Sequence, residues 1–285
     1  MRLSLLQRTI VTIILIAALL PVSLAFGGLP GPPPPAPPPI PTPPLDSEFD
    51  YVKVDDARGQ TGVAEQIEFG TPGKDKIIEY GGTDNVTQYI EAGAGNDWLL
   101  QVGGDKATGQ IAEGGTENDT IYQYGGKGDS ILKVAGGFGN DTIIQVGQGS
   151  NQMEILGGDG ADYIEQYGGL GNNLMYVKPD AGDDIIKMYG GHGNNSMTYD
   201  VGFGNDLATI LGGGGYNTLT INKNDQNFTL QDYQGRVLFQ SGVGGSTITV
   251  ANLQRITVLD DAGKPIYTYN GGIVPSTIVP LLLGN

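Results

Sequence analysis

The chain has 285 residues, of which 48 are glycine and 17 are proline, and it contains no cysteine. So high a glycine and proline content is typical of disordered or fibrous chains unless a repeat explains it, and without cysteine there is no disulfide framework. The net charge of −16 argues against nucleic acid or an anionic membrane as the partner, and it suits cation binding.

Residues 1–25 have the features of a secretory signal peptide. Arg2 and Arg8 precede an apolar run over residues 10–20, and residues 23–25 (SLA) are small enough for a cleavage site. An uncleaved anchor is the less favoured alternative, because the run is shorter than the roughly 20 apolar residues of a spanning helix. We therefore expect a secreted, extracellular protein, with a cell-surface location as a variant, and no membrane span in the mature chain.

Residues 26–46 form a proline-rich arm, with 11 prolines between positions 30 and 44. Such a segment adopts polyproline II, which rises about 3.1 Å per residue. We expect a stiff spacer that takes no part in a packed core, and a ligand for a proline-recognition domain is the alternative.

Residues 70–222 are built from a repeat. Seven aspartates, each at the end of a glycine-rich loop, recur at intervals of 21 or 22 residues. They are Asp75, Asp97, Asp119, Asp141, Asp162, Asp184 and Asp206. A second glycine-rich loop lies about halfway through each unit, so one unit holds two loops and two strands. The repeat predicts an all-β fold, a parallel β-roll or β-helix of two sheets with about 22 residues per turn.

The predicted core follows from the apolar positions. The residue two places after each aspartate is apolar in every unit, which indicates a column that points inward. These residues are Ile77, Leu99, Ile121, Ile143, Ile164, Ile186 and Ala208. The other sheet supplies inward pairs such as Met153 with Ile155 and Met175 with Val177. Turns stacked about 4.8 Å apart would then bury a thin, continuous core.

Two loops carry a resemblance to a known family. GGFGNDTII (136–144) and GGDGADYIE (157–165) resemble the GGxGxDxUx repeat of the RTX, or hemolysin-type, family. The family is a parallel β-roll, and the resemblance implies that each loop aspartate binds calcium together with loop carbonyl groups of neighbouring turns. The implied metal ligands are the seven aspartates, with backbone carbonyl groups near Gly95, Gly139, Gly160, Gly182 and Gly204. The chain departs from the family in its half-turn, which averages about 11 residues instead of nine, and in its N-terminal export signal.

A charge argument points to the same metal. Seven carboxylates stacked about 4.8 Å apart would repel by about 1 kcal/mol per neighbouring pair even in water. Calcium prefers six to eight oxygen ligands, and seven rungs leave room for about six ions between turns. The alternative is an edge held by hydrogen bonds alone, with the aspartates facing solvent. Asp75 stands in an end rung and is expected to be the weakest ligand.

The second loop carries mostly asparagine at the equivalent position. The residues are Asn85, Asp129, Asn151, Asn173, Asn195 and Asn217. Asparagine cannot balance the charge of a cation, but its amide forms hydrogen bonds with the next turn. We therefore predict a one-sided calcium ladder with an asparagine ladder opposite.

Two further columns follow each aspartate. Strict alternation would place a glutamine column, which includes Gln101 and Gln123, inside the coil, and a Tyr/Val column, which includes Tyr124 and Val146, outside. The alternative is a kink that folds the aromatic column over the core edge.

The remaining segments leave the repeat. Residues 47–69 and 223–272 contain short strand patterns and predict small β caps at the two ends, and the second of these resembles the C-terminal cap of family β-rolls. The apolar tail, residues 273–285, either docks onto another subunit by strand addition or packs over its own cap.

No enzyme is expected. The one histidine, His192, lies at a variable loop position, and the sequence has no nucleophile elbow, P-loop or metalloprotease motif. We expect instead a secreted calcium-binding structural protein that assembles with copies of itself into an extracellular filament or surface matrix. The alternative is a monomeric calcium-dependent adhesin or polysaccharide-binding module, with Trp98 and the tyrosines as its platform.

Overall fold

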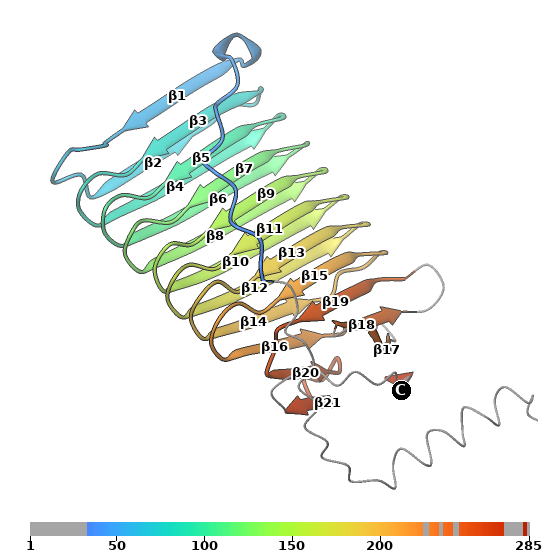
Figure 1. Cartoon of the computed structure of the whole chain (residues 1–285). Coiled ribbons are helices and arrows are strands. Elements are labelled where there is room, and N and C mark those ends of the chain that lie inside the picture. The colour runs from blue at the N-terminus through green and yellow to red at the C-terminus, as the bar shows by residue number, and fades with distance from the viewer. Residues whose placement is uncertain (1–32, 225–227, 234–235, 242–244, 271–281, 284–285) are drawn as a thin grey trace, which may run out of the picture.

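A computed structural model of the chain describes residues 33–224, 228–233, 236–241, 245–270 and 282–283. The expected signal peptide lies outside the described residues, as does most of the tail. Two long sheets face each other in a coil (Figure 1), and the hydrogen-bonded aspartates of adjacent turns are 21 or 22 positions apart. The predicted all-β parallel coil with two sheets is therefore confirmed.

Sheet A takes one strand from each turn. In spatial order its strands are β1 (Tyr51–Asp56), β3 (Asp75–Tyr80), β5 (Trp98–Val102), β7 (Thr120–Tyr124), β9 (Thr142–Val146), β11 (Tyr163–Tyr167), β13 (Ile185–Tyr189), β15 (Leu207–Leu211), β19 (Thr247–Ala251), β18 (Arg236–Ser241), β17 (Phe228–Tyr233) and β22 (Leu282–Leu283). The pairs from β1 to β19 are parallel, and the pairs β19–β18, β18–β17 and β17–β22 are antiparallel.

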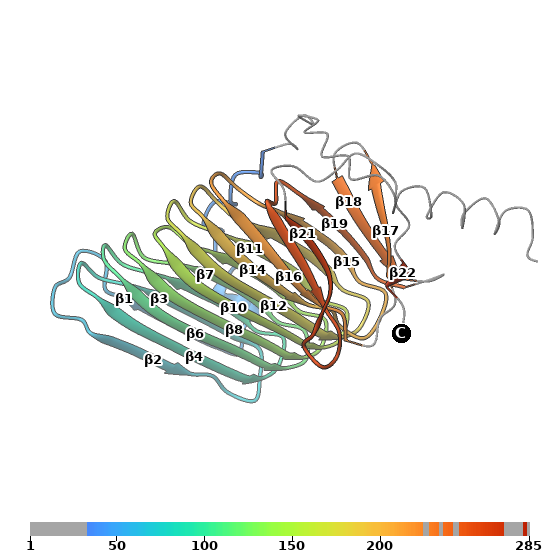
Figure 2. The ribbon, with the colours of Figure 1, turned by 90° about the horizontal axis from the view of Figure 1, so that it is seen from below.

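Sheet B takes the other strand of each turn. In spatial order its strands are β2 (Glu65–Phe69), β4 (Val86–Ala94), β6 (Thr108–Thr116), β8 (Ser130–Phe138), β10 (Asn151–Asp159), β12 (Asn173–Ala181), β14 (Asn195–Asp200), β16 (Asn217–Asn222), β20 (Arg255–Leu259) and β21 (Pro265–Asn270). All pairs are parallel except the last, between β20 and β21. Figure 2, seen from below, shows the two sheets as stacked layers of strands. Among the described residues no helix is long and apolar enough to cross a membrane.

The core lies between the sheets and follows the predicted columns. Ile77, Ile143 and the other members of the sheet A column are fully buried, as are the sheet B pairs Met153 with Ile155 and Met175 with Val177. One continuous apolar cluster joins them along the coil. Each turn therefore buries its apolar surface between its own two strands and against its two neighbours, as in other solenoids.

Glutamines line one side of the interior in the N-terminal half. Gln101, Gln123, Gln145 and Gln166 are fully buried, and each amide Nε2 donates to the side-chain oxygen of the previous turn at 2.8–2.9 Å. Alternation thus holds along sheet A, with the glutamine column inside and the Tyr/Val column outside. The sequence reasoning missed a second ladder on sheet B, formed by Gln66, Gln88 and Gln110.

The coil extends beyond the predicted repeat at both ends. Strands β1 and β2, which lie in the segment expected to be a separate N-terminal cap, pair in parallel with β3 and β4 and form the first turn. At the other end β19 and β20 continue the two stacks, while the β17–β18 hairpin adds antiparallel strands. Residues 282–283 of the tail pair with β17 of the same chain.

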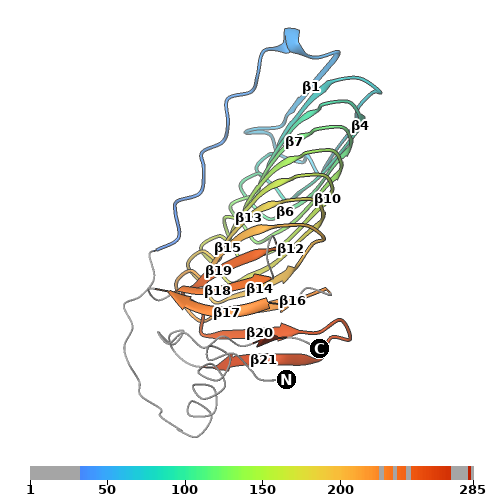
Figure 3. The same ribbon diagram turned by 90° about the vertical axis from the view of Figure 1, so that its right-hand side faces the viewer.

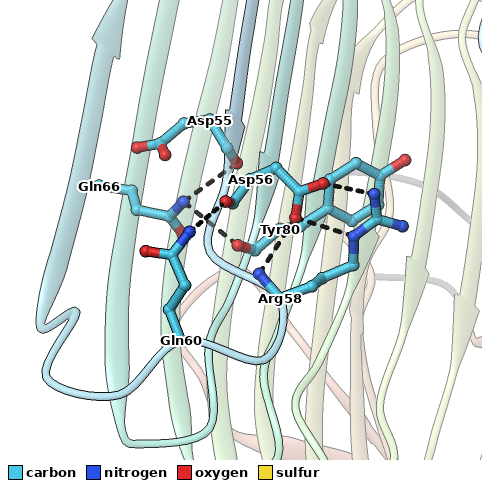
Figure 4. Close-up of polar contacts among 6 residues, drawn as sticks. All are labelled: Asp55, Asp56, Arg58, Gln60, Gln66 and Tyr80. Atoms are coloured by element: carbon cyan, nitrogen blue, oxygen red, sulfur yellow. Dashed lines mark hydrogen bonds and ion pairs between the residues drawn. The ribbon is translucent and has the colours of Figure 1, made fainter.

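A compact polar turn follows β1 at the N-terminal end. The guanidinium of Arg58 pairs with the carboxylate of Asp56 and lies 4.0 Å from the ring centroid of Tyr80 (Figure 4). The amide of Gln66 donates to the carbonyl oxygens of Asp55 and Tyr80, at 3.1 and 3.2 Å. These contacts fix the first turn on the second and satisfy backbone groups where the stack begins.

The proline-rich arm lies along the coil, contrary to the expected free spacer. Residues 33–45 run from the short 3-10 helix η1 (Asp46–Glu48), beside β1, towards the C-terminal strands (Figures 1 and 3). The phenol of Tyr124 donates to the carbonyl oxygen of Pro39 at 2.8 Å, and the ammonium of Lys76 donates to that of Pro44 at 2.6 Å. The arm therefore belongs to the packed structure, because it covers apolar side chains on the outer face of sheet A.

Candidate functional site

The aspartates lie at the corner where each turn passes from sheet B to sheet A. In the loop GGFGND, Gly137 and Gly139 have φ angles of 117° and 130°, a region that L side chains rarely adopt. The two left-handed residues reverse the chain within a few positions and turn the aspartate side chain inward. All seven aspartates are buried, with at most 2% of their surface exposed, so the alternative of solvent-facing aspartates is wrong.

Hydrogen bonds join the aspartates into a ladder. The backbone N–H of Asp119 donates to Oδ1 of Asp141 at 2.8 Å, and that of Asp141 donates to Oδ1 of Asp162 at 2.8 Å. The same bond links every consecutive pair from Asp75 to Asp206, at 2.7–3.3 Å. From Asp97 to Asp206, one oxygen of each carboxylate therefore accepts the backbone N–H of the aspartate in the preceding turn.

The second oxygen is different. In the five inner rungs Oδ2 is buried and accepts no hydrogen bond within the described residues, which holds for Asp97, Asp119, Asp141, Asp162 and Asp184. A buried acceptor without a partner costs about 1–3 kcal/mol, and more when it is charged. The row of five oxygens therefore needs either protons or cations.

The two end rungs are closed. At the N-terminal end the backbone N–H and the hydroxyl of Thr71 both donate to the carboxylate of Asp75. At the other end the hydroxyl of Tyr199 donates to Oδ2 of Asp206 at 3.3 Å, and Asp206 N–H donates to Oγ of Ser246 at 3.1 Å. Asp75 and Asp206 therefore have no unpartnered oxygen to offer a cation, which is a physical reason to expect weak binding at both.

Burial raises the pKa of the ladder carboxyls. The pKa of Asp119 rises from 3.8 to about 8. Burial is the largest cause; the hydrogen bond from Asp97 N–H opposes it, and the carboxylates of Asp97 and Asp141 add to it. The pKa values of Asp97, Asp162 and Asp184 rise to about 7, and those of Asp141 and Asp206 are also raised by burial. An ionised carboxylate without a cation beside it is therefore unfavourable in this ladder.

Three of the five unpartnered oxygens, those of Asp119, Asp141 and Asp162, lie against a glycine. A Cβ built on Gly136 would stand 2.4 Å from Oδ2 of Asp141 and 2.4 Å from the carbonyl oxygen of Gly157. The same arrangement recurs at Gly114 with Asp119, at 2.4 Å. In the rungs of Asp119, Asp141 and Asp162 the free carboxylate oxygen therefore shares a small space with a carbonyl oxygen of the next turn, beside Gly114, Gly136 and Gly157. The equivalent position holds Ala92 in the rung of Asp97 and Pro179 in that of Asp184.

A divalent cation suits this donor set. Calcium takes carboxylate and backbone carbonyl oxygens with flexible geometry, and both kinds converge in the rungs of Asp119, Asp141 and Asp162. No group of three acidic, histidine or cysteine side chains in the described part of the chain could hold a metal. A cation here would accordingly depend on backbone carbonyl groups as well as on one or two aspartates.

The predicted carbonyl ligands stand where glycine is required. All five glycines have φ between 126° and 149°: Gly95, Gly139, Gly160, Gly182 and Gly204. A Cβ on Gly160 would stand 1.8 Å from the carbonyl oxygen of Gly139, and one on Gly182 would stand 1.7 Å from that of Gly160. These carbonyl groups are therefore directed along the stack, towards the next turn.

The sequence reasoning missed an asparagine column beside the aspartates. The N–H of Asn118 donates to Oδ1 of Asn96 at 2.9 Å, and the N–H of Asn140 donates to Oδ1 of Asn118 at 2.6 Å. The repeated Asn-Asp pair in the loops was the available signal. Glu117, which takes a φ of 73°, uses its carboxylate to accept the N–H of Gly95 at 2.8 Å.

The opposite corner carries the predicted asparagine ladder over its C-terminal half. The amide of Asn151 donates to Oδ1 of Asn173 at 2.9 Å, and the chain of bonds continues through Asn195 to Asn217 at 2.8 and 2.7 Å. In the N-terminal half the same column holds Val86, Thr108 and Ser130. Asn85 and Asp129 precede that column by one residue and do not belong to the ladder, because neighbouring residues at the strand start alternate in direction.

The chain matches no family model, no curated protein and no solved structure with which it was compared. The resemblance of its loops to the RTX repeat therefore rests on the motif alone.

Proposed function

We propose that this chain is a secreted structural protein whose aspartate edge binds divalent cations, with calcium as the physiological ion. The observation that carries the proposal is the row of five buried Oδ2 atoms that accept no hydrogen bond. Cations between turns would supply the missing partners and offset part of the net charge of −16. Calcium is also the divalent ion whose preference for oxygen ligands fits carboxylates and bent backbone carbonyl groups.

The proposed structural role includes association with copies of the same chain. Strands β1 and β2 stand at the ends of their sheets, and each pairs with one neighbour. Open strand edges are templates for pairing with another chain. A head-to-tail contact between the two ends of a coil produces an open filament when its rotation does not close into a ring.

Metal analysis of the purified chain tests the cation. After exposure to calcium and removal of the excess, elemental mass spectrometry should find several calcium ions per chain. Asp141→Asn should lower that number, whereas Asp129→Asn should not, because Asp129 is an exposed residue on the other edge. Less than one ion per chain, or equal loss in both variants, contradicts the proposal. Sedimentation with calcium and with chelator then tests assembly.

A second candidate is a polysaccharide-binding module, favoured by a groove of about 620 Å³ along the asparagine edge. Its polar lining includes Ser150, Gln152, Asn172, Asn194 and Ser196. Amide and hydroxyl groups in register along a flat coil suit a linear glycan, although none of the described lining residues is aromatic. Sedimentation with insoluble polysaccharides, with Asn172→Ala and Asn194→Ala as variants, tests this candidate; binding that both variants retain counts against it.

A further inference from the structure

Hydroxyl side chains line the outer face of sheet B at the C-terminal end of the coil, on the neighbouring strands β14, β16, β20 and β21 (Figure 3). These side chains point outward, because the residues next to them on the same strands, such as Met197 and Ile256, are buried in the core. Strands of a sheet lie about 4.8 Å apart, so a rank across them presents hydroxyl groups at regular intervals. One rank holds only threonines: Thr198, Thr220, Thr257 and Thr268.

The rank beside the threonines carries a positive charge. Ser196, Thr218 and Arg255 stand there in register on β14, β16 and β20. The two ranks line a hollow of about 320 Å³, in which Arg255 is the only charged lining residue. The lining is otherwise formed by hydroxyl side chains and by Leu219 and Leu259. The hollow therefore offers one cation, several hydroxyl groups and a small apolar surface.

The hydroxyl groups of this hollow are available to a ligand. At the corners of the coil, stacked polar side chains form hydrogen bonds with the next turn, as Asn173 does with Asn195. In contrast, the hydroxyl groups that line the hollow form no hydrogen bond with any residue that the structure describes; they belong to Ser196, Thr218, Thr220 and Thr257. A hydroxyl group both donates and accepts, so this lining suits a ligand that is itself rich in hydroxyl groups.

Arg255 has no carboxylate partner in the described part of the chain, although the sequence holds 31 acidic and 15 basic residues. Other basic residues on the outer face of sheet B are paired, Lys133 with Glu154 at 2.7 Å and Lys178 with Asp180 at 2.6 Å. The side chain of Arg255 is exposed. Its guanidinium keeps N–H groups in a fork that matches a carboxylate with two parallel hydrogen bonds.

The hollow continues into the groove along the asparagine edge, since Ser196 lines both. The one charged lining residue of that groove is Asp129. Arg255 and Asp129 are therefore separated by a neutral polar path of amide and hydroxyl groups. A densely charged polyanion would be repelled by Asp129 and by the net charge of −16. The charge pattern favours a ligand with an acidic group at Arg255 and neutral polar groups beside it.

We propose that the hollow beside Arg255 binds the carboxylate of an acidic sugar, within a glycan whose neighbouring sugars are neutral. The carboxylate accepts hydrogen bonds from the guanidinium, and the sugar hydroxyl groups bond to Thr218 and Thr220. Leu259 offers an apolar contact to the C–H face of a sugar ring. The inference rests on the polysaccharide-binding candidate and names the charge of its sugar, and it depends neither on calcium nor on self-assembly.

Titration calorimetry of the purified chain with two matched tetrasaccharides tests the site. One alternates glucuronate with N-acetylglucosamine, and the other is the same molecule with its carboxylates reduced to primary alcohols. The acidic tetrasaccharide should bind about tenfold or more tightly than the reduced one, because it adds charge-assisted hydrogen bonds. Arg255→Gln should abolish this difference. Arg255→Lys, which keeps the charge and loses the fork, should retain part of it.

Two matched controls separate the site from general charge and packing effects. Lys264→Gln removes the same charge from an exposed residue in the turn between β20 and β21, and it should leave both affinities unchanged. Thr220→Val keeps the shape of the side chain and removes its hydroxyl group, so it should weaken both tetrasaccharides alike. Thr87→Val, on the same face of sheet B at β4, should weaken neither.

The contrary outcomes distinguish the proposals. Equal affinity for the two tetrasaccharides, or an equal effect of Arg255→Gln and Lys264→Gln, overturns the acidic-sugar site and leaves the polysaccharide-binding candidate standing. Binding that chelator abolishes and Arg255→Gln does not change also overturns the site, because calcium would then hold the carboxylate. If neither tetrasaccharide binds, the site and the polysaccharide-binding candidate fail together. The metal content of the chain tests the calcium proposal separately.

Discussion

The two edges of the coil solve the same problem with different side chains. On the aspartate edge, and on the opposite edge from Asn151 to Asn217, one polar residue per turn stacks on its neighbour in the next turn. Asn173 donates through Nδ2 and accepts through Oδ1, so both polar atoms of its amide have a partner in a neighbouring turn. An ionised aspartate only accepts, and Asp141 therefore keeps one oxygen without a partner. Among the described residues the asparagine ladder leaves one buried oxygen without a partner, Oδ1 of Asn151 at its N-terminal end, whereas the aspartate ladder leaves five. The difference teaches that an amide ladder satisfies its own members except at its end, whereas a carboxylate ladder needs a proton or a cation at each inner rung.

Removal of calcium should have the largest effect. Five buried oxygens would lose their partners together, and at about 1–3 kcal/mol each the free energy of unfolding should fall by on the order of 5 kcal/mol or more. Denaturant unfolding with calcium and with chelator measures the change. Amide hydrogen exchange then locates it: protection should be lost at Asp119 and Asp141 and retained at Asn173. Equal loss at both edges would contradict the comparison.

Exchange of the two residue types tests the comparison directly. Asn173→Asp would direct carboxylate oxygen at Oδ1 of Asn195 and at the carbonyl oxygens of Gly171 and Gly190. An uncompensated buried charge of this kind should lower the free energy of unfolding by about 3–5 kcal/mol at pH 7. The reverse change, Asp141→Asn, replaces the unpartnered Oδ2 by an amide group that can donate to a nearby carbonyl oxygen. In chelator it should lower the free energy of unfolding by less than about 1 kcal/mol. An equal loss in the free energy of unfolding for both variants in chelator would contradict the comparison of the two edges.

Glu79 is a buried carboxyl at the end of the interior glutamine ladder, where it accepts a hydrogen bond from Gln101. It therefore combines a carboxyl, as on the aspartate edge, with an amide neighbour, as on the asparagine edge. Burial raises its pKa from 4.5 to about 8; the hydrogen bond from Gln101 lowers it, and Glu68 and Asp55 raise it. The folded protein therefore holds a proton that the unfolded chain releases above pH 4.5. Its contribution to stability is fully present below pH 4.5 and is lost as the pH rises to about 8.

Glu79→Gln should remove that pH dependence and extend the glutamine ladder by one amide. At pH 7 we expect a gain on the order of 2–3 kcal/mol in the free energy of unfolding. Denaturant unfolding from pH 5 to 8 measures it. Glu113→Gln, on the exposed face of sheet B, is the matched control and should change little. A gain that does not vary with pH would show that Glu79 is not the titrating group.

Substitution of a glycine beside an aspartate should give the smallest of the effects. In Gly136→Ala the new Cβ meets two oxygens at 2.4 Å, and this overlap should cost about 1–3 kcal/mol. It should also weaken any bound cation at Asp141. The control is Gly109→Ala on β6, where the nearest atom to the new Cβ is Oγ1 of Thr87 at 3.9 Å. This control should be neutral or stabilising by up to about 1 kcal/mol, and an equal cost at both sites would refute the proposed crowding.

Sequence reasoning predicted the parts of this protein that repeat. The period of the aspartates and the apolar column that includes Ile143 fixed the strand order, the two sheets and the inward faces. They did so because a solenoid turn contacts only its neighbours, so residues at the same position of consecutive repeats are also in contact in the structure. The asparagine ladder was predicted too, but its N-terminal half was misassigned, since irregular loops hide a shift of one residue at Asn85 and Asp129.

Contacts between segments that lie far apart in the chain could not be predicted from the sequence. No pattern in residues 33–45 shows that Pro39 meets Tyr124, 85 positions away. Likewise the closure of the end rungs by Thr71 and Ser246 depends on where the stack stops. The sequence by itself determined the coil, its core and the edge that carries carboxylates, because each follows from a periodic pattern read one turn at a time. Only the tertiary structure decided which carboxylate oxygens lack a partner and what covers sheet A, because both depend on contacts that have no period.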